Sequence, residues 1–170
     1  DLGKTKSSKN IIEHSRFLHN ELSIRLAKRV YNLFNLPYGL PLVSEISEVI
    51  NLYSSSFNRI QTAPVPICPE SVKDFTHVIR DIKNSHNLLE EIIGNGLQNL
   101  SNPFIDYGII NHELDNFFMS RIGIRTLISQ QVENVLHNNS IIVDCDVHTI
   151  MKDAIKEVGK MSRLQSGTEI

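Results

Sequence analysis

Between residues 109 and 136, apolar side chains recur every three or four positions, a spacing that predicts a long helix with one buried face. Arg121 stands in the middle of that apolar face. A guanidinium keeps its charge in proteins and is costly to bury without a partner. The helix must therefore either extend Arg121 to water or find an anion for it. The predicted face consists of Leu114, Phe117, Phe118, Arg121, Ile124, Ile128 and Val132.

Two other predicted helices also place polar groups on their apolar faces. A helix over about Ser71–Leu100 carries His86 at a core position. A helix over about Pro41–Thr62 becomes polar on its inner face at Tyr53 and Ser56. In a helical bundle, such interruptions converge on one pocket when they lie at the same height.

Each polar group also has an ordinary structural interpretation. A single buried histidine is commonly a satisfied core residue, and a tyrosine hydroxyl at the edge of a core is unremarkable. Arg121 has two acidic residues near it in the sequence, Glu113 and Asp115, and either would neutralise it. The pattern by itself leaves both a shared pocket and a plain core open.

The remaining periodicity predicts a mainly α fold, with an antiparallel four-helix bundle over residues 10–138. A first helix over about Asn10–Leu36 precedes the three already described, and the connections between all four are short. After the bundle the period changes, so that Ser140–Cys145 reads as a strand and Val147–Met161 as a helix. One strand cannot make a sheet. Residues 139–170 are therefore predicted to begin an α/β domain that this chain does not complete.

Composition excludes several classes of function. Seventeen basic and nineteen acidic residues give a formal charge of −2, which argues against bulk nucleic-acid binding. No apolar run is long enough to cross a membrane. The two cysteines, Cys68 and Cys145, are isolated, so we expect neither a disulfide framework nor a metal site. The first nine residues are polar and basic, unlike a secretory signal, and the absence of an initiator Met suggests that a targeting segment is already missing.

No set of catalytic residues can be defended. Glu91 and Asn95 have a spacing that could hold Mg²⁺, but no phosphate-binding glycine loop follows them. Gly94 and Gly96 are better explained by a close crossing of two helices. His86 or His112 could carry a phosphoryl group in a two-component phosphotransfer bundle, and this alternative stays open.

Three blocks of sequence carry a family resemblance. They are a first-helix block over Phe17–Ala27, with Ser23 where proline is usual, a third-helix block from Asp81 to Gly96, and Met119–Arg125, which is the most specific. On these blocks the chain resembles the mitochondrial protein kinases of the 2-oxoacid dehydrogenase complexes, which act on pyruvate dehydrogenase or its branched-chain counterpart. The His-to-Gly spacing is closer to the branched-chain kinase. Gln130 and Gln131 depart from the family's usual Gln-His or His-His pair.

The resemblance implies an N-terminal four-helix regulatory domain followed by a GHKL-type ATP-binding domain, here only begun. The parent activity would be phosphorylation of a serine on the E1α subunit, which inactivates the complex in the mitochondrial matrix. ATP and Mg²⁺ would bind in the missing domain, so this chain alone is expected to be catalytically inert, with no cofactor or metal of its own. Expected partners are E1α and the lipoyl domain of E2, and the full-length protein is expected to form a homodimer.

The resemblance also implies a pocket for a small organic acid inside the bundle. Arg121 would bind the carboxylate of the acid, and Tyr53, Ser56 and His86 would donate further hydrogen bonds. The positions that match the family's pocket are Leu26, Tyr53, Ser56, Ile82, His86, Arg121, Ile124, Arg125 and Ile128. The alternative is a non-enzymatic interaction bundle that docks on the lipoyl-bearing E2 core.

Overall fold

The computed structural model describes residues 8–98, 105–137 and 146–166. The chain divides into two compact units, Asp1–Asn139 and Ser140–Ile170, and each is described by itself. None of the described helices combines the length and the apolar character that a membrane crossing requires.

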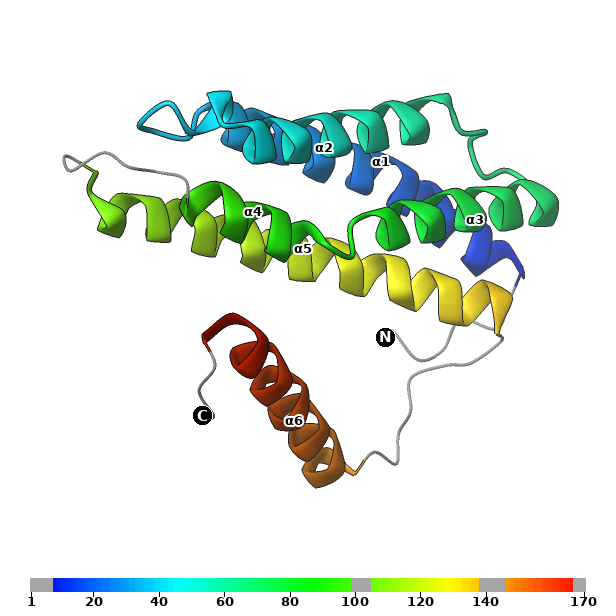
Figure 1. Ribbon diagram of the computed structural model, residues 1–170. Coiled ribbons are helices and arrows are strands. Elements are labelled where there is room, and N and C mark those ends of the chain that lie inside the picture. Colours follow the sequence, from blue (N-terminus) through cyan, green and yellow to red (C-terminus); the bar gives the residue numbers. More distant parts are fainter. Residues whose placement is uncertain (1–7, 99–104, 138–145, 167–170) are drawn as a thin grey trace. The chain divides into compact units, whose positions relative to one another are not determined.

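The first unit is a helical bundle, as the sequence predicts. Figure 1 shows that the chain reverses direction after α1, after α2 and again before α5, while α4 continues the course of α3. Helix α1 packs against α2, α3 and α5, and further contacts join α3 to α5 and α2 to α4. The elements are α1 (Ser8–Phe34), the 3-10 helix η1 (Leu40–Leu42), α2 (Ser44–Thr62), α3 (Pro69–Ser85), α4 (Leu89–Gln98) and α5 (Tyr107–Leu136).

Local sequence signals explain where these helices begin and end. Tyr38 and Gly39 take left-handed backbone conformations, with φ of 59° and 73°, and turn the chain between α1 and η1. Pro69 occupies the first position of α3, where a proline costs no hydrogen bond. Asp106 accepts a hydrogen bond from the Gly108 amide at 2.8 Å and so caps α5.

The prediction of one helix over Ser71–Leu100 is wrong. The helix stops at Ser85, the backbone turns through His86–Leu88, and α4 begins at Leu89. His86 has φ −93° and ψ 13° and ends α3 as its C-terminal cap. The Ser85 hydroxyl donates to the Ile82 carbonyl at 2.8 Å, and such local side-chain bonds compete with helical hydrogen bonding. The apolar spacing persists across the break, which is why periodicity alone missed it.

The core of the bundle is mostly aliphatic, with a few buried polar side chains that bond to one another. Gln131 of α5 donates from its amide nitrogen to the Ser15 hydroxyl at 2.7 Å and to the Thr76 hydroxyl at 3.3 Å. The three residues come from α5, α1 and α3, so this cluster joins three helices inside the core.

The described part of the second unit is the helix α6 (Val147–Ser166). Asp146 precedes it and accepts hydrogen bonds from the backbone amides of His148 and Thr149, at 3.1 and 3.4 Å. The expected strand over Ser140–Cys145 and the expected domain boundary near residue 139 lie outside the described residues. The GHKL-type domain therefore stays a prediction.

Candidate functional site

The polar groups predicted on separate helices meet at one level of the bundle. His86 lies at the end of α3 and is buried, with 5% of its surface exposed. Its Nε2 lies 2.9 Å from the Ser56 hydroxyl, and its ring centre lies 4.6 Å from that of Tyr53. Ser56 and Tyr53 sit three residues apart on α2, which places both on the same helix face.

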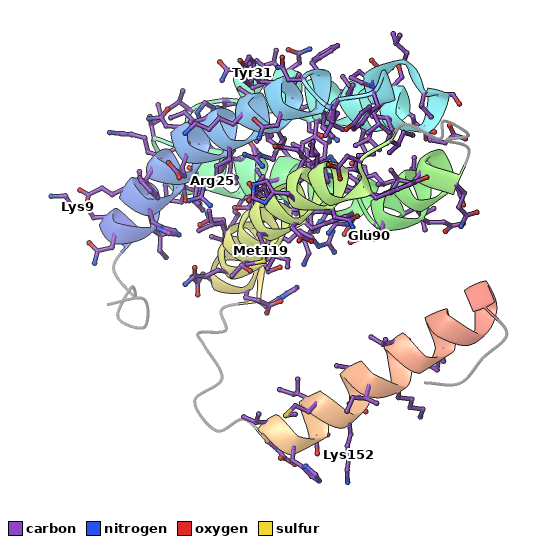
Figure 2. All side chains as sticks on the ribbon, turned by 90° about the vertical axis from the view of Figure 1, so that its left-hand side faces the viewer. Lys9, Arg25, Tyr31, Glu90, Met119 and Lys152 are labelled. Carbon is purple, nitrogen blue, oxygen red and sulfur yellow. The ribbon has the colours of Figure 1, made fainter. Side chains whose placement is uncertain are left out.

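Arg121 enters this group from α5 and is buried, with 6% of its surface exposed. Its Nη2 donates to the His86 carbonyl at 2.7 Å and to the Glu90 carboxylate at 3.0 Å. Glu90 is the acidic partner, not the nearby Glu113 or Asp115 that the sequence suggested. The Glu90 side chain is 48% exposed, and it comes from α4 (Figure 2).

Arg125 lies one turn further along α5 and is half-buried. Its Nη1 donates to the Lys83 carbonyl at 3.1 Å, and its Nη2 donates to the Asn87 side-chain oxygen at 3.2 Å. The carbonyls of Lys83 and His86 lie at the C-terminal end of α3, where a helix leaves carbonyls without intrahelical partners. The break between α3 and α4 therefore supplies both arginines with acceptors, and the negative end of the helix dipole favours their charge.

The electrostatics of this cluster keep its titratable rings neutral. Burial, together with the charges of Arg121 and Arg125, lowers the pKa of His86 to about 4. Burial raises the pKa of Tyr53 to about 12, although Arg121 and Arg29 oppose that rise. At neutral pH both rings can therefore donate a hydrogen bond without carrying a charge.

The apolar residues predicted for the site are all buried in the core of the bundle. Phe117 adds an aromatic ring that the resemblance did not include, with its centre 5.5 Å from that of Tyr53. The four predicted residues are Leu26, Ile82, Ile124 and Ile128.

Two charged residues near the site were missed in the sequence. Glu90 follows His86 by four positions, but because the helix breaks between them, helical periodicity does not show that both residues lie next to Arg121. Arg29 lies on the inner side of α1, because it follows Leu22 by seven residues and Leu26 by three. Arg29 interrupts the apolar face of α1 just as Arg121 interrupts that of α5, so the sequence pattern could have indicated it.

The side-chain nitrogens of Arg29 and Arg121 share an unusual property. In residues 8–98, 105–137 and 146–166, only two buried side-chain nitrogen or oxygen atoms lack a hydrogen-bond partner, and they are the Nε atoms of these two arginines. Native proteins rarely leave buried donors unpaired. The cluster can therefore donate more hydrogen bonds than its own residues accept.

Other chemistries find less support in this region. The described residues contain no group of three or more His, Cys, Asp or Glu side chains placed to hold a metal ion. His86 is buried against Ser56, which argues against its role as a phosphoryl acceptor. His112 is exposed, and its Nε2 lies 3.2 Å from the Asn116 side-chain nitrogen.

Comparison with known proteins identifies the family. The model of the family described as mitochondrial branched-chain alpha-ketoacid dehydrogenase kinase matches residues 1–157. The chain belongs to the mitochondrial 2-oxoacid dehydrogenase kinase family. Within this kinase family it corresponds to the N-terminal regulatory domain.

Individual relatives of this kinase family carry the pyruvate dehydrogenase name. The mitochondrial pyruvate dehydrogenase (acetyl-transferring) kinase of Arabidopsis thaliana is 36% identical over 140 residues, which cover 81% of this chain and 38% of the relative. The Ascaris suum kinase of the same name is 29% identical, with 91% of this chain and 41% of the relative covered. Isozyme 3 of Mus musculus is 29% identical, with 85% and 38% covered. The chain thus spans about two fifths of the length of these curated relatives.

Proposed function

We propose that this chain is the regulatory bundle of a mitochondrial protein serine kinase, and that it binds a small organic acid beside Arg121. The observation that carries the proposal is the buried Arg121 guanidinium, whose Nε has no acceptor and beside which the neutral side chains of Tyr53, Ser56 and His86 converge. A carboxylate is the ligand group that matches a guanidinium best, because it accepts two parallel hydrogen bonds.

Each polar neighbour has a defined part in binding the acid. The Ser56 hydroxyl donates to the Leu52 carbonyl at 2.8 Å and lies 2.9 Å from the Nε2 of neutral His86, so a carboxylate oxygen beside this pair would take over a proton that these bonds now use. The Tyr53 hydroxyl, which stays protonated, donates to the same ligand. The apolar tail of the acid would lie among Leu26, Ile82, Ile124 and Ile128. Arg125, half-buried one turn further along α5, adds positive charge next to the site.

Glu90 links the binding of an acid to a change in the contacts between helices. Its carboxylate pairs with the Nη2 of Arg121, and because the side chain is half exposed it can move into water at little cost. An acid bound to Arg121 would compete with Glu90 for the guanidinium. Release of Glu90 would loosen the contact between α4 and α5, and that change is the proposed regulatory signal.

Isothermal titration calorimetry with 2-chloropropionate and with 2-oxo acids tests this proposal. We expect binding to the wild-type chain, and a loss of affinity of at least about 10-fold in Arg121→Met, since a charge-assisted bidentate contact is removed. Arg80→Met is the matched control, because the Arg80 side chain is 42% exposed and pairs, within the described residues, with Asp81 at 3.5 Å. Circular dichroism verifies that each variant is folded. Equal binding by wild type and Arg121→Met would contradict the proposal.

The remaining functions belong to the complete protein. By kinship, we propose that the whole kinase phosphorylates and inactivates the E1 component of a 2-oxoacid dehydrogenase complex in the mitochondrial matrix. It would use ATP and Mg²⁺ bound in its GHKL-type domain, associate with E1α and the lipoyl domain of E2, and form a homodimer. Phosphorylation of purified E1α by the full-length protein, measured with labelled ATP, tests this activity.

A second candidate function is an interaction bundle that docks on the lipoyl-bearing E2 core without a role for the acid site. An exposed apolar row on α1 favours it. Phe17, Ile24 and Tyr31 follow one another at seven-residue intervals and are all exposed, and Tyr31 points away from the bundle (Figure 2). A lipoylated domain should then retain wild-type chain and Arg121→Met equally, and Ile24→Ser with Tyr31→Ser should weaken retention.

A further inference from the structure

A second guanidinium lies beside the site and has no part in the binding of a monocarboxylic acid. Arg29 projects from α1 toward α5, where its Nη1 donates to the Asn116 carbonyl at 3.4 Å, close to the limit for a hydrogen bond. Its Nε is closed off from solvent and has no acceptor. Among the residues that the structure describes, the Asn116 carbonyl is thus the one acceptor of this guanidinium, and the bond to it is weak.

A chain of contacts connects Arg29 to Arg121. Asn116 precedes Phe117, whose ring packs on Tyr53. Tyr53 packs on His86, and the His86 carbonyl accepts from Arg121. Asn116 and Arg121 are five residues apart on α5, which is roughly 7.5 Å along the helix axis. Both guanidinium groups also act on the Tyr53 hydroxyl, because the charge of each opposes the rise in the Tyr53 pKa. The two arginines therefore act on the same tyrosine.

The balance of charge around this tyrosine is positive. Arg29, Arg121 and Arg125 act on its hydroxyl, and Glu90 is the acidic residue that acts with them. Arg125 has two acceptors of its own, whereas the buried Nε atoms of Arg29 and Arg121 have none. One carboxylate on Arg121 would satisfy one of these two orphaned donors. It would leave the second unpaired.

We propose that the acid site extends to Arg29 and prefers a 2-oxo dicarboxylate of four or five carbons. One carboxylate pairs with Arg121 beside Ser56 and His86, and the other pairs with Arg29 at its contact with Asn116. This inference rests on the proposed acid site, and it adds Arg29 as the residue that sets the ligand class. The second carboxylate satisfies the remaining orphaned donor, and a ligand with a charge at each end suits two groups whose contacts on α5, at Asn116 and Arg121, lie roughly 7.5 Å apart along the helix axis.

Two ligands of equal length test the inference. 2-Oxoglutarate and 2-oxopentanoate share a 2-oxo carboxylate and a five-carbon chain, and they differ in a carboxylate or a methyl group at the far end. Calorimetric titration of the wild-type chain should show that 2-oxoglutarate binds at least about 10-fold more tightly. In Arg29→Met this preference should disappear, while the affinity for 2-oxopentanoate stays within about threefold. Arg29→Lys should keep part of the preference, and Arg80→Met all of it.

The outcomes separate this inference from the function on which it rests. If 2-oxopentanoate binds the wild-type chain as tightly as 2-oxoglutarate, or if the preference survives in Arg29→Met, Arg29 does not select the ligand and only this inference fails. If neither acid binds the wild-type chain, the acid site fails and the inference fails with it. A melting curve for each variant establishes that lost affinity does not reflect lost folding, and Arg29→Lys provides the test if Arg29→Met is unfolded.

Discussion

His86 is a buried base that the fold accepts only in its neutral form. Its ring lies between Tyr53 and Ser56, and the two arginines nearest to it carry permanent positive charge. Protonation would place a third positive charge beside them in a region shielded from water. Because the protonated form is disfavoured in this way, the pKa of His86 is lowered to about 4.

The stability of the chain should therefore fall as the pH drops below the ordinary histidine pKa of about 6.5. Between that pH and about 4 the unfolded state binds a proton at His86 that the folded state does not bind, so acid favours unfolding. We expect this residue to account for about 2 kcal/mol of lost stability between pH 7 and pH 5.

Urea unfolding of wild type and His86→Gln at pH 7, 6 and 5 checks this expectation. Glutamine can keep a hydrogen bond to Ser56 but does not titrate, so the difference in stability between the two proteins should narrow as the pH falls. A difference that is constant over this range would show that His86 does not carry the effect.

At the scale of single elements, the break between α3 and α4 does most to shape the site. It releases the carbonyls of Lys83 and His86 from helical bonding and presents them to Arg125 and Arg121. It also brings Glu90 next to Arg121. A continuous helix would bond those carbonyls internally and leave both arginines short of acceptors, so the polar interior of the bundle depends on the interruption.

The crossing of α4 over α2 depends on a glycine. A Cβ atom added at Gly96 would lie 3.0 Å from the Glu45 Cβ and 3.5 Å from two Ile46 side-chain carbons. The Cβ of Glu45 is fixed to its backbone and cannot move aside without moving α2. Gly94, two residues earlier, has no atom within 4 Å of an added Cβ. The prediction of a close helix crossing thus holds for Gly96 and is wrong for Gly94.

Alanine substitutions at the two glycines should have opposite effects. Gly96→Ala should destabilise the bundle by about 1–3 kcal/mol, since the helices must separate to admit a methyl group. Gly94→Ala should stabilise it by about 0.5–1 kcal/mol through helix propensity. Thermal unfolding followed by circular dichroism at 222 nm distinguishes them, and a destabilised Gly94→Ala would contradict this account.

At the scale of the whole bundle, Gln131 joins three helices through two hydroxyl groups. The Ser15 and Thr76 hydroxyls also donate to the carbonyls of Ile11 and Val72 in their own helices, at 2.7 Å each. Their protons are thus satisfied without Gln131, and only their acceptor capacity depends on it. If Gln131 is replaced, the hydroxyl groups of Ser15 and Thr76 can therefore stay buried, because each keeps its hydrogen bond to a carbonyl of its own helix.

This arrangement predicts that shape matters more than polarity at position 131. Gln131→Leu fills most of the space and leaves no donor proton unpaired, so we expect a cost of about 1 kcal/mol or less. Gln131→Ala leaves a cavity between three helices, and we expect a cost of about 2–3 kcal/mol. Urea denaturation of both variants measures the difference, with the half-buried Gln130→Ala as a control. Equal losses in the two variants would show that the hydrogen bonds, not the packing, dominate.

Much of this molecule follows from the order of its residues. Apolar spacing determined that the chain forms long helices with one buried face each, and it placed Tyr53, Ser56, His86 and Arg121 on those faces. These are local properties, because helical periodicity repeats within a few residues and needs no knowledge of a neighbouring helix.

Only the tertiary structure decided which groups satisfy one another. The pairing of Arg121 with Glu90 and the contact of Arg29 with Asn116 join residues that are 31 and 87 positions apart. The break at His86 leaves the apolar spacing intact. The buried arginines reach their acceptors on α3, α4 and α5 only when the helices pack. Sequence periodicity reports which side of a helix is buried. It carries no information on the height at which two helices meet, and that height determines where each buried charge finds its acceptors.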